Sequence, residues 1–514
     1  MKIGFRNFKR FNNFHPVSLA PITIMVGTNN SGKSTFIKAL ALLLENLNLT
    51  AWGVWEPPLK RFSFQETNTR YGWGDFASMR CRGAYSDTMV FEWSTEHFKF
   101  SVSFGAGGEE MALSPDLYAR PEVKEFTISG DDSATISYTY DSENRCWDVA
   151  LSGIDRDELA NWLNSRLEWF CLLERARKGE DAAVEYKDFS KYSDFIALEH
   201  YRKEPRSERE TVEMERMLEN LDRGKEIAEP VQLSGKSGKG DSNPVFVSIL
   251  SDYAHRVILR ASAEIKNDYA ADMFYIEAHN ASHDFILRAD DKNNTLAQTV
   301  SEYYSQVDSR LMIPESGEKS IEIKGWVCKW LRNLNIVKYF EINREGQGTW
   351  FSVKVLGIHD SDSGVGSDAY SDLGTLGTGS IQIFILLLKI AVALSKWRAD
   401  GRQILIAVEE PEQNLHPAMQ SKLADLFLEV SAITGGNVRF IVETHSEYLI
   451  RRSQVIVAED NDALEKFKVY YFPEDGQPYD MEYRTDGHFE EAFGEGFFDE
   501  AGKWYRALAI NRQK

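Results

Sequence analysis

Residues 27–35 are the part of this chain whose residue types and spacing most clearly specify a chemistry. They read G-T-N-N-S-G-K-S-T, so a glycine-bounded loop runs directly into Lys33 and Ser34. Such a loop wraps nucleotide phosphates with inward-facing backbone N–H groups, while its lysine reaches the β- and γ-phosphates and its serine hydroxyl binds Mg²⁺. The sequence therefore predicts ATP and Mg²⁺ as cofactors, with the nucleotide held by Gly27, Asn29, Asn30, Ser31, Gly32, Lys33, Ser34 and Thr35.

Two adjacent carboxylates, Glu409 and Glu410, follow a second apolar run at residues 404–408. Neighbouring residues of a strand point to opposite faces, so the two carboxylates can act separately. Glu409 is predicted to hold Mg²⁺ through water, beside the Ser34 hydroxyl, and Glu410 is predicted to orient or deprotonate the attacking water. Taken alone, such a pair can equally be solvated charge at the edge of a sheet.

A third apolar run, at residues 440–442, leads into Glu443-Thr444-His445-Ser446. A histidine at the carboxyl end of a strand in an α/β sheet lies at the edge where nucleotides bind. His445 is therefore predicted to contact the γ-phosphate as a sensor, although a single histidine is more often structural.

Glycines also precede a long apolar helix predicted from about Ile381. Gly377, Gly379 and Ser380 stand at its start, with Ser380 able to cap it, which is the arrangement of a second anion-binding helix terminus. One nucleotide needs one such cradle, so this one is predicted to serve a nucleotide held by another subunit. The alternative is a simple helix-capping loop.

These residues require a particular set of elements around them. A buried strand is predicted at 22–26 and a helix at 36–44, on either side of the glycine loop. Alternating apolar residues predict antiparallel strands within 51–105 and 125–150. Helices are predicted within 155–226, 244–270 and 292–340. Strands are expected at 273–278, 351–355 and 466–472, and residues 403–450 alternate strand, helix, strand, helix.

Composition narrows the class of protein. The formal net charge is −20, from 59 basic and 79 acidic residues, which argues against a chain coated in nucleic acid but permits local DNA or RNA contact. The four cysteines are scattered and show no zinc or disulfide spacing. The most apolar run, 381–394, contains Lys389 and is too short to span a bilayer. A cytoplasmic protein with no membrane association is predicted.

Taken together, these motifs resemble those of ATP-binding cassette (ABC) ATPases of the SMC, Rad50 and RecF type. The residues of these motifs are closer still to those of the overcoming-lysogenization-defect (OLD) group. Three motifs carry this resemblance: G-T-N-N-S-G-K-S-T at 27–35, E-E-P-E-Q-N-L-H-P at 409–417 and E-T-H-S-E-Y at 443–448. Two departures are Glu409, where SMC-type heads usually carry aspartate, and L-G-T-G-S-I-Q in place of the transporter-like signature. The chain most resembles the Septu anti-phage ATPases of the PtuA type, including retron-associated forms.

The resemblance implies an α/β ABC-ATPase head with a mixed sheet, an antiparallel β subdomain and a helical insertion. The head would comprise residues 1–105 and 273–465, with an insertion at 106–272 and a terminal strand and tail at 466–514. About seventy residues follow the His445 strand, too few for the Toprim nuclease domain of OLD proteins. The Q-loop residue would be Gln65 or Asp75.

The function implied is an ATPase that forms a homo-dimer or higher oligomer around ATP and regulates a separate HNH-type effector nuclease in bacterial defence. One alternative is a RecF- or SMC-like repair ATPase acting directly on DNA. Another is a self-contained OLD-like nuclease. The residues also leave open a metal site at His279 and His283, nucleic-acid contact at the basic clusters 202–206 and 451–452, and a docking role for the phenylalanine-rich segment at 493–498.

Overall fold

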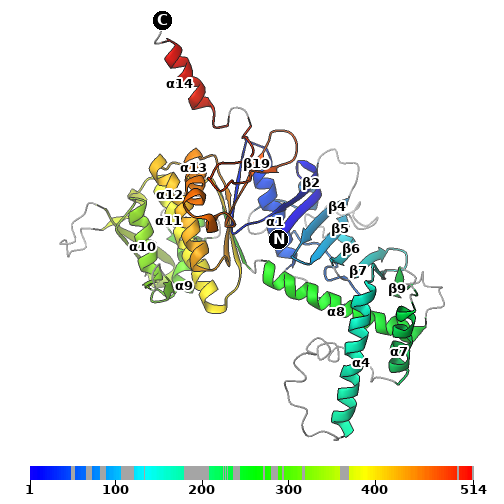
Figure 1. The fold of residues 1–514 in the computed structure, drawn as a ribbon. Coiled ribbons are helices and arrows are strands. Elements are labelled where there is room, and N and C mark those ends of the chain that lie inside the picture. The colour runs from blue at the N-terminus through cyan, green and yellow to red at the C-terminus, as the bar shows by residue number, and fades with distance from the viewer. Residues whose placement is uncertain are drawn as a thin grey trace. The chain divides into compact units, whose positions relative to one another are not determined.

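The computed structural model describes most of the chain. The described residues are 1–47, 52–64, 72–81, 88–105, 121–131, 134–178, 208–223, 225, 227, 230–234, 243–269, 272–278, 287–291, 294–314, 319–358, 370–494 and 497–511. They form two compact units, each assembled from separate stretches of chain (Figure 1). The first unit comprises Met1–Ser18 and Ala39–Tyr269, and the second comprises Leu19–Lys38 and Ala270–Lys514.

The first unit is built on an antiparallel sheet. Within the described residues its strand order is β2-β1-β4-β5-β6-β7-β8-β9, and every neighbouring pair is antiparallel. Burial alternates along β4, where Met89, Phe91 and Trp93 face the core. The strands are β1 (Lys2–Phe8), β2 (Phe11–Ser18), β4 (Thr88–Ser94), β5 (Phe98–Gly105), β6 (Glu122–Gly130), β7 (Thr135–Asp141), β8 (Cys146–Ser152) and β9 (Val231–Ser234).

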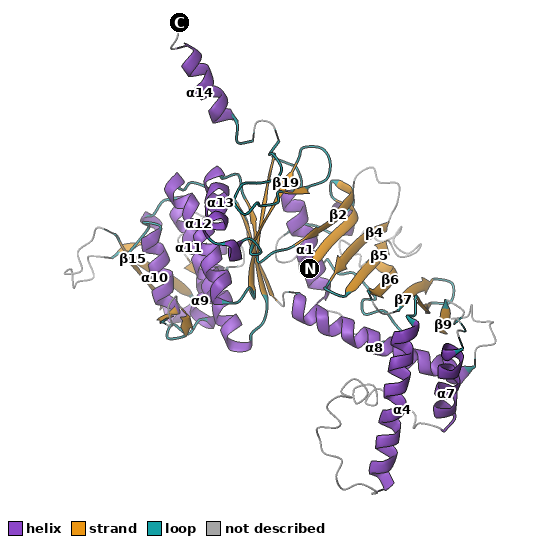
Figure 2. Ribbon diagram, viewed as in Figure 1, coloured by secondary structure: helices purple, strands orange, loops and turns teal. Residues whose placement is uncertain are grey.

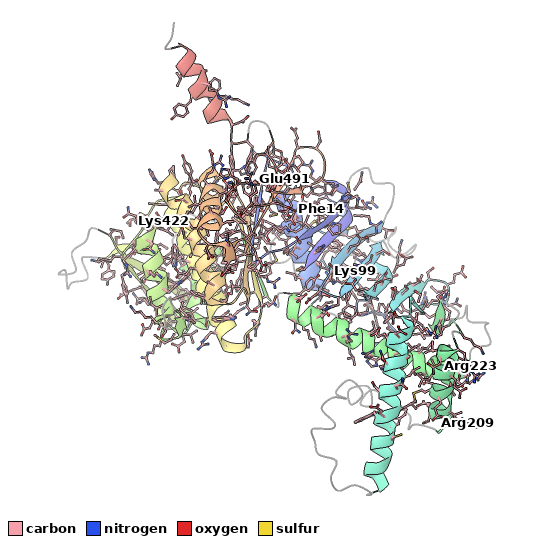
Figure 3. The ribbon with its side chains drawn as sticks, in the orientation of Figure 1. Phe14, Lys99, Arg209, Arg223, Lys422 and Glu491 are labelled. Atoms are coloured by element: carbon pink, nitrogen blue, oxygen red, sulfur yellow. The ribbon has the colours of Figure 1, made fainter. Side chains whose placement is uncertain are left out.

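Helices complete the first unit: α3 (Phe76–Met79), α4 (Arg156–Lys178), α7 (Glu208–Asp222) and α8 (Pro244–Asp268). Helix α7 packs against α4 and α8, and α8 also contacts β6 and β9. Arg209 and Arg223 lie at the two ends of α7, and Lys99 extends from β5 (Figure 3). Helix α1 (Lys33–Leu47) runs from residues of the second unit into residues of the first.

The second unit contains the sheet that carries the glycine loop. Its order is β10-β17-β18-β3-β19-β20, in which all neighbours are parallel except β19 and β20. Parallel strands buried on both faces read as continuous apolar runs, as these do. The strands are β3 (Ile22–Gly27), β10 (Asp272–Ile276), β17 (Ile404–Glu409), β18 (Val438–Glu443), β19 (Phe467–Phe472) and β20 (Tyr479–Asp480).

Helices gather beside this sheet (Figure 2). Helix α11 contacts α9, α10, β17 and β18, and α12 contacts α13, β3 and β18. The helices are α9 (Thr295–Gln306), α10 (Ile323–Asn333), α11 (Thr378–Asp400), α12 (Pro417–Ile433), α13 (Glu447–Glu459) and the terminal α14 (Glu500–Asn511). Smaller strands are β11 (Leu287–Arg288), β12 (Met312–Pro314), β13 (Ser320–Glu322), β14 (Tyr339–Glu345), β15 (Trp350–Leu356) and β16 (Ser371–Asp372).

Helix α11 is the apolar centre of the second unit. Among the described helices it alone is long and apolar enough to cross a membrane, yet 89% of its most apolar window is buried inside the protein. Burial of that kind is typical of the core helix of a globular domain.

The expected mixed α/β fold, with a glycine-loop sheet and a separate antiparallel sheet, is confirmed. The predicted helix at 292–340 is wrong in its middle, because the hairpin β12–β13 separates α9 from α10. The proposed boundary at residue 105 falls between β5 and β6, which are neighbours in one sheet.

Candidate functional site

Three strands of the second unit end at one edge of its sheet. β3 ends at Gly27, β17 at Glu409 and β18 at Glu443, and the parallel register aligns Glu409 with Glu443. Because the carboxyl ends of parallel strands meet at one edge, the loops that follow them converge there. This edge therefore gathers Lys33, Ser34, Glu410 and His445, as the motifs predicted.

The loop after β3 has the backbone conformation that its glycines permit. Gly27, Asn30 and Gly32 have φ angles of 145°, 61° and 106°. A Cβ atom on Gly27 would lie 2.1 Å from the carbonyl oxygen of Phe472 on β19, so only glycine fits there. The chain then enters α1 at Lys33, which aims a helix N-terminus at the space that the loop encloses.

Lys33 is buried beneath this loop. Its Nζ donates to the carbonyl oxygens of Thr28 at 2.8 Å and Gly27 at 3.2 Å, and it lies 3.7 Å from Glu443 Oε1. Burial lowers the pKa of the Lys33 ammonium, although nearby carboxylates, Glu443 first, oppose that shift. An ammonium held by carbonyls and one carboxylate is well placed to exchange those contacts for phosphate oxygens.

Two hydroxyls in the loop support a phosphate ligand. Thr28 Oγ1 and Ser31 Oγ are buried and have no hydrogen-bond partner within the described protein. A buried hydroxyl left unpaired costs about 1–3 kcal/mol, so such groups normally signal a missing partner. Asn29 and Asn30 are exposed, and Thr35 is partly exposed in the first turn of α1. The residues present therefore fit a bound nucleotide.

Glu443 lies closest to the loop, and the motif-based predictions gave it no role. Its Oε2 accepts a hydrogen bond of 2.8 Å from Ser34 Oγ. Burial, and then the neighbouring carboxylate of Glu409, raises the pKa of Glu443 to about 7. Its position at the end of an apolar strand could have indicated a functional role. Assigning that role required the order of the strands in the sheet, which the sequence does not state.

Glu409 lies one strand further from the loop and has a phenolic partner. Tyr275 on β10 donates its hydroxyl to Glu409 Oε1 at 2.5 Å. Burial, followed by the charge of Glu409, raises the pKa of Tyr275 far above its ordinary value, so its hydroxyl remains a donor. The sequence gave no sign of this pairing, because 134 positions separate the two residues.

Glu410 is held in an unusual backbone conformation at the turn after β17. Its φ is 43°, its N–H donates to the carbonyl oxygen of Glu443 at 2.7 Å, and Gln382 on α11 donates to its own carbonyl oxygen at 3.1 Å. Its carboxylate lies 3.9 Å from His445 Nε2 and accepts a long bond of 3.4 Å from Gln413. Strain of this kind is commonly found at functional sites.

Glu412 ties the turn after β17 to the turn after β18. Its buried carboxylate accepts the N–H of His445 at 2.7 Å, and burial raises the pKa of Glu412. Burial, and then the charge of Lys33, lowers the pKa of His445, which favours the neutral imidazole. His445 is thus oriented through its backbone N–H, and its ring lies near the Glu410 carboxylate.

Of the two glycines at the start of α11, Gly379 contacts the turn after β17, whereas Gly377 has open space around it. Gly377, not Ser380, occupies the N-cap, and no side chain caps the helix. Gly379 packs so tightly that a Cβ atom would lie 2.6 Å from the carbonyl oxygen of Asn414. Ser380 lies in the first turn of α11, where its N–H donates to the carbonyl oxygen of Gly377 at 3.0 Å.

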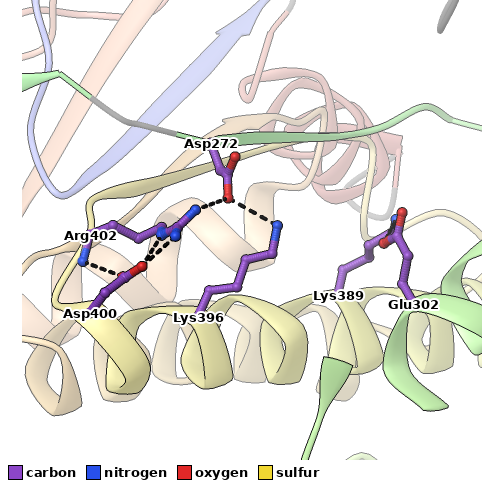
Figure 4. A network of polar contacts seen from close by, with 6 residues as sticks. All are labelled: Asp272, Glu302, Lys389, Lys396, Asp400 and Arg402. Carbon is purple, nitrogen blue, oxygen red and sulfur yellow. Dashed lines mark hydrogen bonds and ion pairs between the residues drawn. The ribbon is translucent and has the colours of Figure 1, made fainter. Parts of the chain in front are cut away.

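A network at the opposite end of β10 fixes α11 beside the sheet (Figure 4). Asp272 accepts from Lys396 at 2.9 Å and from Arg402 at 3.2 Å. Closer to the N-terminus of α11, Lys389 pairs with Glu302 on α9 at 2.6 Å. These partly buried pairs hold in register the helix that carries Gln382 and the strand that carries Tyr275.

The remaining candidates take structural places or fall outside the described residues. Asp75 caps α3 by accepting the N–H of Ser78 at 2.9 Å. The residues that the structure describes do not include Gln65, His279, His283 or the cluster 202–206. Arg452 pairs with Asp425. Among the described residues, no group of three histidine, cysteine or acidic side chains could hold a metal ion by itself.

Known proteins resemble this chain to different degrees. No curated protein matches it closely enough to count as a relative. The SMC head domain of Pyrococcus furiosus, solved with an extended coiled coil and bound to the C-terminal domain of ScpA, is 10% identical, with a TM-score of 0.31 over 99% of this chain and 98% of that one. The SMC head domain of Thermotoga maritima is 10% identical, with a TM-score of 0.32 over 94% and 98%.

A family model matches far more directly. The model described as AAA ATPase domain covers residues 1–450, which include the glycine loop, Glu409, Glu410, Glu443 and His445. The family match and the site agree, and the chain belongs to the AAA_15 family of AAA ATPase domains.

Proposed function

We propose that this ATPase binds Mg²⁺–ATP between two copies of itself in the manner of ABC-type heads, and that this dimerisation regulates a separate HNH-type nuclease in anti-phage defence. The observation that carries the dimer is the N-terminus of α11. Gly377 is exposed, no side chain caps the helix, and a Cβ atom there would meet nothing within 4 Å. An open helix N-terminus with glycine at its N-cap is suited to a phosphate brought by another subunit.

The residues divide the chemistry of hydrolysis. Lys33 and the α1 N-terminus bind the phosphates, and Mg²⁺, when bound, neutralises charge on the phosphate oxygens. Glu410 orients the attacking water and takes its proton, while neutral His445, whose Nε2 lies 3.9 Å from the Glu410 carboxylate, contacts the γ-phosphate. Asn414 and Glu412 connect this machinery to α11 and to the β18 turn.

A complementation experiment tests the shared site. Lys33→Ala removes the phosphate-binding ammonium, and Gly377→Asp places a negative charge at the N-cap of α11. Each variant alone is expected to be inactive, whereas an equal mixture should regain about a quarter of wild-type turnover, because half of the dimers are mixed and each carries one intact site.

The matched control is Gly377→Asn. Asparagine and aspartate are both good N-caps, and the backbone at Gly377 (φ −68°) suits any residue, so the two variants differ in charge rather than in folding. Gly377→Asn should keep most of the turnover. A mixture no more active than the sum of its two components would rule out a site shared in this way.

A further inference from the structure

We propose that Glu443, rather than Glu409, is the carboxylate that shares Mg²⁺ with Ser34, and that Tyr275 positions Glu409 in a supporting role. The inference rests on the Mg²⁺–ATP assignment made under Proposed function, but it is independent of dimerisation. It replaces the pairing of Ser34 with Glu409 that the motifs alone predicted.

The order of the strands determines how far each glutamate lies from Ser34. β18 lies between β3 and β17, so Glu443 is one strand away from the phosphate loop and Glu409 is two strands away. Adjacent strands are about 4.8 Å apart, so a carboxylate at the end of β17 starts roughly 5 Å further from Ser34 than one at the end of β18.

The contacts agree with this order. Ser34 Oγ and Glu443 Oε2 lie 2.8 Å apart, so both oxygens already face the same point at the N-terminus of α1. The serine that follows the loop lysine is the expected metal ligand in such loops. Mg²⁺ needs only one or two carboxylates when phosphate oxygens and waters complete its shell, so one glutamate beside Ser34 suffices.

Glu409 is hydrogen-bonded to Tyr275 instead of Ser34. One of its oxygens accepts the short hydrogen bond of 2.5 Å from Tyr275, whose strand β10 lies on the side of β17 away from β18. A hydrogen bond to an ionised acceptor is about twice as strong as a neutral one, so leaving it for a metal ion is costly. Glu409 then acts through charge on the metal site, and Tyr275 fixes its direction.

Manganese binding separates the two glutamates. The full chain is titrated with Mn²⁺ in the presence of a non-hydrolysable ATP analogue, and bound Mn²⁺ is read by electron paramagnetic resonance. Glu443→Gln keeps an oxygen for the Ser34 hydroxyl but removes the charge, and it should weaken Mn²⁺ binding by at least about 100-fold. Glu409→Gln and Tyr275→Phe should weaken it by only about tenfold, the lower end of the range typical of groups that support a metal ligand.

Binding of the analogue in EDTA separates the possible failures. If wild type binds no analogue either in EDTA or with Mn²⁺, the nucleotide assignment fails together with the inference. If analogue binding is intact but Glu409→Gln loses more Mn²⁺ affinity than Glu443→Gln, only the inference is overturned. Should Glu443→Gln fail to fold, Glu443→Asp and Glu409→Asp replace the pair, and a larger loss for Glu409→Asp overturns it in the same way.

Discussion

At the scale of single residues, the site is a set of carboxylates kept apart by different partners. Glu443 faces Ser34 and Lys33, Glu409 is held by Tyr275, and Glu410 is held on its backbone by Gln382 and Glu443. Each partner comes from a different element. The carboxylates can therefore take separate tasks even though two of them are adjacent in sequence.

Removal of the charge of Glu410 should stop turnover while leaving nucleotide binding intact. Glu410→Gln keeps the shape and the backbone contacts but cannot accept a proton from water, and loss of a general base typically costs about 10²–10⁴ in rate. Phosphate release and binding of a fluorescent ATP analogue measure the two properties. Glu447→Gln removes an exposed carboxylate of α13 and serves as the control. Turnover within about twofold of wild type would show that Glu410 is not the base.

At the scale of elements, the turn between β4 and β5 is joined to α8 by a pH-sensitive cluster. Glu264 on α8 lies 2.8 Å from His97 Nδ1, and it accepts hydrogen bonds from Thr95 Oγ1 at 2.5 Å and from the His97 N–H at 3.2 Å. The hydrogen bond to Glu264 raises the pKa of His97. Burial opposes ionisation of Glu264, but bonds from Thr95 and His97 outweigh it and lower its pKa.

The sign of each shift sets a pH window. The raised pKa of His97 stabilises the fold fully below its ordinary value of 6.5, and that stabilisation is lost as pH rises through the folded-state pKa. The lowered pKa of Glu264 stabilises the fold above its ordinary value of 4.5 and is lost on acidification. Glu264→Gln should therefore reduce the unfolding temperature most between about pH 5 and 6.5.

Thermal unfolding of wild type and variant at pH 6 and pH 8.5 checks this window. Asp131→Asn is the matched control, since Asp131 pairs with Lys99 beside the same turn and the pair contains no histidine. The effect of Glu264→Gln should shrink at the higher pH while that of Asp131→Asn stays constant. Equal effects of Glu264→Gln at both pH values would contradict a role for the His97 charge.

Sequence patterns predicted the elements that carry long apolar runs but not the way in which they pair. β3, β17 and β18 are recognisable because parallel buried strands are continuously apolar, and α11 is recognisable by its length. The three-residue strands β12 and β13 were missed, because so short a segment shows no period. Glu443 and Tyr275 were missed because their roles depend on strand order, which contacts distant in sequence determine.

At the scale of the whole molecule, the partner proposed for this ATPase is testable in an assembled system. Any HNH-type protein found encoded in a neighbouring reading frame is produced together with the full chain, and cleavage of DNA is followed with and without ATP. Cleavage is expected to depend on both proteins and to change with Lys33→Ala. Metal-dependent cleavage by this chain alone would favour a self-contained nuclease instead, and salt-dependent duplex binding by the chain alone would favour direct action on DNA.

The central place of β3 in its sheet also has a consequence for how the chain is made. Residues 22–27 leave the ribosome well before both strands that pair with β3, which lie far downstream at 438–443 and 467–472. At about 5–20 residues per second, β18 follows β3 roughly 20–80 s later. Until then the apolar strand before the glycine loop lacks the two strands that pair with it in the folded sheet, so its pairing is completed only after β18 and β19 have been made.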